Sequence, residues 1–229
     1  MGIWIARLPA SALAWLALLA APAAAASWEA GLSALEEGRV EKAASIFKRI
    51  APQGDVRAQF ALGVMYLEGR GVARDPERAA GWIQRSARAG FLPSQTVLGR
   101  MYLLGLGLPE DAGEALKWYR AAAAYGDVNA QGALGLIYDQ GWAGLPANPV
   151  VAAQWLALAE KGGSRVATKH LERVRARLSP EQLGAVERHV AAWKPKRAPK
   201  DWAGSREDAA RKLGETLGLD SVDLLRSLH

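Results

Sequence analysis

The sequence contains no cysteine and only three histidines. Without cysteine the chain has no disulfide, no thiolate metal site and no cysteine nucleophile. No carboxylate is placed near any of these histidines at the spacing that a metal-binding or acid–base motif requires. The three are His170, His189 and His229. No glycine-rich motif that could cradle a phosphate is present either. The sequence therefore predicts no catalytic residue, no metal site and no cofactor.

Long uncharged runs are also lacking, except for one at the N-terminus. Residues 8–28 carry no charge, follow one arginine, and include a run of small residues at 23–27. This order is typical of a secretory signal peptide, which we expect at residues 1–26 with cleavage after Ala26. Cleavage one residue earlier and retention as a membrane anchor are alternatives. Because two prolines bracket only a short apolar stretch, the pattern favours removal and an exported protein, periplasmic or secreted.

Positive charge is concentrated in one stretch of a chain whose formal net charge is +6. Residues 161–200 hold eleven Lys or Arg and three Glu, a net of +8. One interpretation is a solvated terminal helix followed by a charged linker. The other is a surface for an anionic membrane, an anionic glycan or an acidic partner. We do not expect nucleic acid as a partner, because no nucleic-acid-binding module is recognisable and the chain is predicted to be exported.

A repeat of 36 residues fills the middle of the chain. Residues 58–66 recur as residues 94–102 and again as residues 130–138, two steps of 36. The second half of the unit recurs as well, with one extra residue in the last loop. Its matched positions are Ala79, Ala115 and Ala152, then Trp82, Trp118 and Trp155, then Gly90, Gly126 and Gly163. We therefore expect each unit to fold as a helix, a glycine-rich turn, a second helix and a glycine turn.

The matched positions have physical explanations. Ala58, Leu62 and Tyr66 are four residues apart and form one stripe of the first helix. A glycine inside a helix costs about 1 kcal/mol relative to alanine, so three glycines in register indicate close approach of a neighbouring helix. These interior glycines are Gly63, Gly99 and Gly135. The tryptophans at the matched positions of the second helix are expected to fill the core between units.

The helix ends are marked equally clearly. Glycines at the end of each first helix suit a left-handed C-terminal cap, and Asp or Asn at the start of each second helix suits an N-cap. The expected C-cap glycines are Gly69, Gly105 and Gly141, and the expected N-caps are Asp75, Asp111 and Asn148.

Because one helix pair cannot bury its apolar face alone, the repeat predicts an all-α fold, a right-handed α-solenoid of stacked antiparallel helix pairs. A tail at the C-terminus is too small to fold by itself, and it either docks on the solenoid or waits for a partner. The expected parts are an N-terminal tetratricopeptide-like helix pair at 27–56, three repeats at 57–163, a capping helix pair at 164–193, a basic linker at 194–204 and a short helical tail at 205–229.

The repeat pattern is Ala-x-x-x-Leu-Gly-x-x-Tyr-x-x-Gly followed by Gly, Asp, Ala, Trp and a final Gly. This pattern resembles the Sel1-like repeat, a relative of the tetratricopeptide repeat. The loop Gly69-Arg70-Gly71-Val72 matches it closely, and the resemblance covers residues 58–163 strongly and 28–54 weakly. It departs at residues 112–113, where the loop is short, and at Glu160, where an alanine is usual. The family implies superhelical scaffolds for protein interaction, often secreted or periplasmic in bacteria, with no single partner.

In a tetratricopeptide-like stack the first helices line the concave face. Side chains outside the Ala/Leu/Tyr stripe should point into that face, and their mixture of apolar and polar types suits a peptide groove. The candidate partner-binding residues are Arg57, Phe60, Val64, Glu68, Thr96, Arg100, Leu104, Leu136 and Gln140. The alternative is a solvated wall without a ligand. Trp142, in the extended third loop, is either an exposed anchor for a partner or a side chain folded back onto the loop.

The expected function is that of a periplasmic scaffold or regulatory adaptor that binds an envelope protein or peptide and is not an enzyme. One alternative is an envelope assembly factor associated with a glycan or membrane surface through residues 161–200. A hydrolase acting on cell-wall or lactam substrates, an activity of some cysteine-rich relatives, is the remaining alternative. The missing cysteines and the lack of a nucleophile–base pair argue against it.

Overall fold

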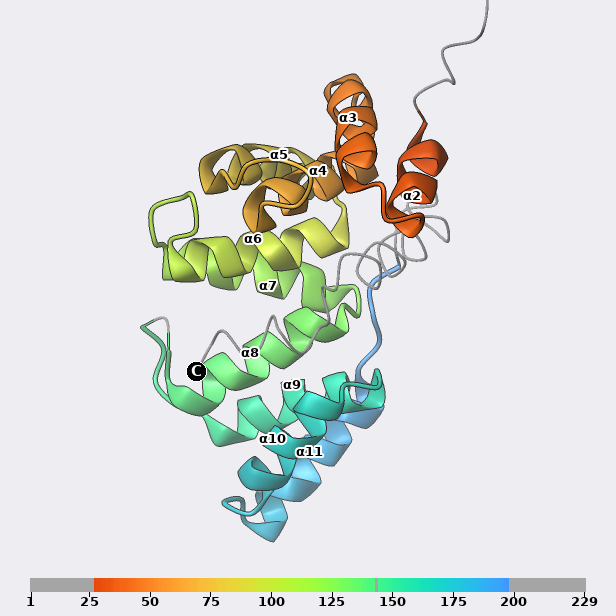
Figure 1. The fold of residues 1–229 in the computed structure, drawn as a ribbon. Helices are drawn as coiled ribbons and strands as arrows, with labels where there is room; N and C mark the ends of the chain where they lie inside the picture. The colour runs from red at the N-terminus through yellow and green to blue at the C-terminus, as the bar shows by residue number, and fades with distance from the viewer. Residues whose placement is uncertain (1–26, 143, 198–229) are drawn as a thin grey trace, which may run out of the picture.

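A computed structural model describes residues 27–142 and 144–197, in which all regular structure is helical. Figure 1 shows the helices stacked from α2 and α3 at one end to α10 and α11 at the other. Their bounds are α2 Trp28–Glu36, α3 Val40–Ile50, α4 Val56–Glu68, α5 Pro76–Arg88, α6 Leu92–Leu104, α7 Ala112–Ala124, α8 Val128–Gln140, α9 Pro149–Lys161, α10 Arg165–Arg175 and α11 Pro180–Ala192, with a short 3-10 helix, η1, at Ala51–Gln53. The prediction of an all-α solenoid is confirmed.

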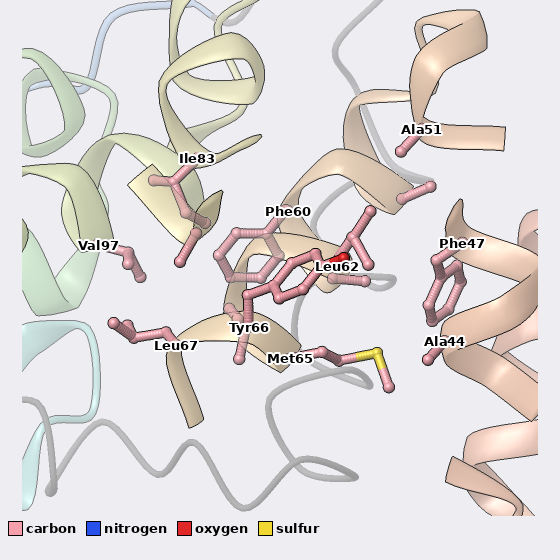
Figure 2. Packing of buried hydrophobic residues seen from close by; sticks show 14 of the residues in the cluster. Ala44, Phe47, Ala51, Phe60, Leu62, Met65, Tyr66, Leu67, Ile83 and Val97 are labelled. Carbon is pink, nitrogen blue, oxygen red and sulfur yellow. The ribbon is translucent and has the colours of Figure 1, made fainter. Parts of the chain in front are cut away.

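Each first helix of a repeat lies between two second helices. Helix α4 contacts α3 and α5, α6 contacts α5 and α7, and α8 contacts α7 and α9. Figure 2 shows this around α4, where Met65 points toward Ala44 and Phe47 of α3 while Ile83 and Val97 lie on the other side. Because a helix enclosed in this way needs apolar side chains on most of its surface, α4, α6 and α8 contain few charged residues.

The predicted caps of the repeat helices are confirmed. Asp75, Asp111 and Asn148 each accept a hydrogen bond from the backbone N–H three residues ahead, at 2.9–3.1 Å. These bonds satisfy N–H groups that have no partner inside the helix. The first helices end at glycines with left-handed backbones, φ 63–71°, which are Gly69, Gly105 and Gly141.

The glycines inside the first helices allow close helix packing, as predicted. A Cβ added at Gly63 would lie 2.7 Å from Ile83, and one at Gly135 would lie 2.5 Å from Leu156. At Gly99 the ring of Tyr119 would be 3.1 Å away. Each second helix therefore places one large side chain on the glycine of its own first helix.

The tryptophans do not fill the core, and that prediction is wrong. Trp82, Trp118 and Trp155 are only partly buried and pack against the edge of the core. The residue after each tryptophan is the buried one, because one residue turns a helix by about 100°. These fully buried residues are Ile83, Tyr119 and Leu156, the same side chains that meet the interior glycines.

A repeated glutamine joins each unit to the one before it, a contact that the sequence did not reveal. The side-chain amides of Gln59, Gln95 and Gln131 donate to the carbonyl oxygen eight residues earlier, at 3.1–3.3 Å. That carbonyl lies at the end of the preceding second helix, where backbone carbonyls lack a partner within the helix. All three glutamines are buried, so the bond is shielded from water.

In the first two repeats, a loop glycine holds the loop against the preceding second helix. Gly107 has a φ of 69°, and an added Cβ would lie 2.0 Å from the carbonyl oxygen of Pro76. Gly71 has a φ of 67°, and its Cβ would lie 2.7 Å from the carbonyl oxygen of Val40. Only a residue without a side chain can take this conformation at such close range.

The C-terminal end departs from the repeat. Helix α10 packs against α9 as the first helix of a new unit would, and α11 also packs on α9. Ser179 is the N-cap of α11, and together with Gln182 it forms a capping box. The predicted signal peptide, the rest of the basic linker and the helical tail at 205–229 lie outside the described residues. Over the described ranges, none of the helices combines the length and the apolar character needed to span a bilayer.

Candidate partner-binding surface

Four of the nine predicted binding residues do not line an open wall. Phe60, Val64, Thr96 and Leu136 are at most 4% exposed, so the prediction that they point into a groove is wrong for them. The reason is the enclosure of the first helices by their neighbours. The ring of Phe60, for example, packs edge-on against the ring of Phe91 at 5.3 Å between centroids.

Thr96 has a structural role that its position in the repeat did not suggest. Its hydroxyl donates to the carboxylate of Asp127 at 3.0 Å. Asp127 also caps α8 by accepting a hydrogen bond from the backbone N–H of Ala130 at 2.7 Å. Thr96 therefore ties α6 to the turn between α7 and α8.

Arg57 is engaged by residues at the N-terminal end of the solenoid. Its guanidinium lies 2.8 Å from the carboxylate of Asp55 and 3.8 Å from that of Glu29, and it stacks over the ring of Trp28 at 5.1 Å. Burial of Asp55 raises the pKa of that carboxyl, but hydrogen bonds from Arg57 and from the backbone of Ala58 outweigh it. The pKa of Asp55 is therefore below its usual value.

The remaining predicted residues form a row along the first helices. Glu68, Leu104 and Gln140 occupy equivalent positions at the ends of α4, α6 and α8, and Arg100 lies one helical turn before Leu104. Glu68 and Gln140 are exposed, whereas Arg100 and Leu104 are partly buried. We call these four residues the inner row, and they are the part of the predicted surface that is accessible to a partner.

Arg100 is the unusual member of the inner row. Its Nε is buried and has no hydrogen-bond partner, and none of the ion pairs in the described part of the chain involves it. Burial raises the pKa of the nearby Tyr119 hydroxyl, and the charge of Arg100 opposes that shift. A buried donor without a partner costs about 1–3 kcal/mol, so its presence calls for an explanation.

Trp142 folds back onto its own loop. Its backbone N–H donates to the carbonyl oxygen of Ile137 at 3.0 Å, and its carbonyl accepts from Leu145 at 3.1 Å. The side chains of Trp142 and Leu145 are partly buried and pack against the core of the second and third repeats. Of the two alternatives for Trp142, the structure supports the folded-back one.

The basic residues of α10 and of the turn after it fall into two groups. Arg175 and Arg177 are paired with Glu160 and Asp139 from other helices. The second group is exposed along one face of α10 at spacings of four residues, and it comprises Arg165, Lys169 and Arg173. Arg173 also contacts the buried His170 ring at 2.8 Å. Within residues 27–142 and 144–197, no three His, Cys, Asp or Glu residues are grouped so that they could hold a metal ion.

A surface hollow of about 370 Å³ lies between α9, α10 and α11. Its floor is apolar and its rim carries charges of both signs. The lining residues are Ala157, Glu160, Lys161, Arg175, Val186, Glu187, Val190 and Ala191. Sequence reasoning missed this hollow because it forms where α11 packs on α9, a contact without a counterpart in the repeats.

Solved structures of repeat proteins resemble this chain. A Sel1 repeat protein from Oxalobacter formigenes is 31% identical, with a TM-score of 0.55 over 66% of this chain and 45% of the other. A protective antigen of uropathogenic Escherichia coli strains with an SLR fold is 25% identical, with a TM-score of 0.46 over 75% of this chain and 45% of the other. The chain thus spans less than half the length of each. A comparison with curated proteins found no match.

Comparison with family models gives the same result at the level of the repeat. The model described as Sel1 repeat matches residues 56–91, 92–127 and 128–164, which are the helix pairs α4–α5, α6–α7 and α8–α9 with their turns. The three units recognised from the sequence and the three helix pairs of the structure coincide with these matches. Residues 56–164 of this chain therefore form three Sel1 repeats.

Proposed function

We propose that this protein is a periplasmic scaffold or regulatory adaptor that binds an envelope protein or peptide through the inner row. Three stacked Sel1 repeats support an interaction role, and the predicted signal peptide supports the periplasmic location. The single observation that carries the choice of surface is the buried Nε of Arg100, which lacks a hydrogen-bond partner.

The chemistry of Arg100 and Leu104 defines the partner that would fit. A guanidinium binds a carboxylate through two parallel N–H donors, and such a bond is stronger where water is partly excluded. Leu104, one turn further along α6, offers a partly buried apolar contact beside the charge. The proposed ligand is therefore a peptide segment in which an acidic side chain lies next to an apolar one.

Capture of partners in the intact cell envelope tests the proposal. Cells expressing the wild type, Arg100→Gln or Arg88→Gln are crosslinked, and the captured proteins are quantified by mass spectrometry. Loss of a hydrogen bond to a charged group costs about 1.5–3 kcal/mol, so Arg100→Gln should reduce specific capture about tenfold or more. Arg88 is exposed at the end of α5, away from the inner row, so Arg88→Gln should capture as the wild type does.

Two results would contradict this assignment. The first is equal capture by all three proteins when circular dichroism shows the same helical content and the same melting temperature. The second is turnover of a cell-wall or lactam substrate by the purified mature protein, which would make it an enzyme.

A second candidate is an envelope assembly factor held on an anionic membrane or glycan surface. The observation in its favour is the exposed row of Arg165, Lys169 and Arg173 on α10. Like charges four residues apart destabilise a helix by about 0.2–0.5 kcal/mol per pair, and an anionic surface would offset that cost. Vesicles containing anionic lipid should then retain the protein at low salt and release it at high salt, and neutral vesicles should not retain it.

A further inference from the structure

The segment after α11 turns back along the solenoid. The backbone N–H of Lys196 donates to the carbonyl oxygen of Ala124 at 2.8 Å, and the Lys196 ammonium lies 5.9 Å from the ring centroid of Tyr125. Pro195 lies against Gly126 in the same turn. Figure 1 shows this segment running from α11 toward the turn between α7 and α8. The chain therefore leaves the described part in the middle of the repeats.

The α7–α8 turn contacts α6 about one helical turn before Arg100. Asp127 of that turn accepts the hydrogen bond from Thr96 of α6 at 3.0 Å. Thr96 lies four residues before Arg100 on the same helix, which is about 6 Å along the helix axis. The hydrogen bond between Lys196 and Ala124 thus fixes the end of the described chain beside a turn that contacts α6 near Arg100.

The residues that follow have a composition complementary to the inner row. Residues 213–225 contain three acidic residues, no basic residue, five leucines and a valine. The acidic residues are Glu215, Asp220 and Asp223. They offer carboxylates for Arg100, and the leucines offer apolar surface for Leu104. Residues 161–200, by contrast, are strongly basic, so the acidic residues form a separate group.

The chain is long enough to reach. Eight residues, 198–205, span about 26 Å when extended, at about 3.3 Å per residue. Helix α6 has 13 residues and is about 20 Å long. Residues 213–225 can therefore lie anywhere along α6 and its neighbours without displacing Lys196 from the α7–α8 turn.

We propose that residues 213–225 bind across the inner row of the same chain, with a carboxylate of the segment on the Arg100 guanidinium and leucines over Leu104. This inference rests on the proposed function, because it makes the segment an internal competitor for the same surface. A tethered ligand acts at an effective concentration on the order of millimolar, so an external partner binds only as the segment is displaced.

The absence of cysteine from the chain makes a direct test practicable. Full-length protein carrying Gln140→Cys and Ser221→Cys is treated with a short bismaleimide crosslinker, and linked peptides are identified by mass spectrometry. The matched control carries Arg88→Cys with the same Ser221→Cys, which places the first cysteine on α5 outside the inner row. We expect at least a tenfold higher intramolecular yield for the Gln140 pair, independent of protein concentration.

Two charge-neutralising variants extend the test. Arg100→Gln in the Gln140 pair should lower the crosslinking yield, as should the combined Glu215→Gln, Asp220→Asn and Asp223→Asn. Equal yields from the Gln140 and Arg88 pairs, or a yield that neither variant changes, would overturn the inference.

The crosslinking result and the partner-capture result are independent. A specific crosslink to the inner row, with no effect of Arg100→Gln on partner capture in the variant whose three carboxylates are neutralised, would support the internal contact and refute the proposed function. An effect of Arg100→Gln on capture, with equal crosslinking to both faces, would support the proposed function and refute the internal contact. If both proposals hold, the variant with three neutralised carboxylates should capture several times more partner than the wild type.

Discussion

Replacing Gly135 with alanine should destabilise the protein, although alanine is the better helix former by about 1 kcal/mol. An added Cβ would lie 2.5 Å from Cγ and 2.8 Å from Cδ2 of the buried Leu156, and 3.2 Å from its backbone nitrogen. Rotation of the leucine side chain does not relieve the contact with the backbone, so α9 must shift. Overpacking costs about 1–3 kcal/mol, and a clash that reaches the backbone should fall at about 2–3 kcal/mol, in the upper part of that range. After the gain from alanine, the net loss should be about 1–2 kcal/mol.

Thermal unfolding followed by circular dichroism measures this loss. A change of 1 kcal/mol shifts the melting temperature by about 2–4 °C in a chain of this size, so Gly135→Ala should lower it by about 2–8 °C. Gly81→Ala is the matched control, because Gly81 is inside α5 with no atom within 4 Å of an added Cβ. That substitution should raise the melting temperature by about 2 °C. If both variants are stabilised equally, the interior glycines are not there for helix packing.

Three further predictions concern two other repeated contacts and the Asp55 carboxylate. Gln131→Leu removes the donor to the Ala123 carbonyl and should lower stability by about 1–3 kcal/mol in denaturant titrations, whereas an unchanged midpoint would show that the bond is dispensable. Gly107→Ala adds left-handed strain and a clash with Pro76, and should cost at least about 2 kcal/mol by the same measurement; a smaller loss would mean that the loop moves freely. The pKa of Asp55 is lowered by folding, so its stabilising effect is complete above the ordinary pKa of 3.8 and is lost as pH falls through the lower folded value. Melting temperatures between about pH 5 and about pH 2 should therefore fall less steeply for Asp55→Asn than for the wild type, and parallel curves would contradict this.

Features that depend on the local backbone were predictable from the sequence. Gly69, Asp75 and their equivalents mark helix ends because left-handed backbones and unpaired N–H groups demand those residue types. The interior glycines were interpretable for the same reason, since a glycine at Gly63 has a cost that only close packing explains. These residue patterns can be interpreted without knowing how the neighbouring repeats pack against the unit.

Features that depend on neighbouring units were not predictable. Whether Trp82 or Ile83 is buried depends on the orientation of the second helix about its axis, because successive residues differ by about 100°. The spacing of the alanines and tryptophans does not determine that orientation. Phe60 and Val64 were expected on an open wall because the degree of enclosure of α4 is a tertiary property. Arg100 was identified from its position in the repeat, but its unpaired Nε is visible only in the structure.

The hydrogen bond between Lys196 and Ala124 affects how the C-terminal end opens. In a stack where each unit contacts only its neighbours, the terminal helices fray first and independently of the middle. Here α11 is followed by a segment bonded to the turn after α7, so unfolding of the last helices must also release a contact with the second repeat. Amide hydrogens in α11 should therefore exchange with solvent at rates closer to those of α7 than their terminal position would suggest. A solenoid otherwise built of sequential contacts thus gains cooperativity from one short segment that crosses its units.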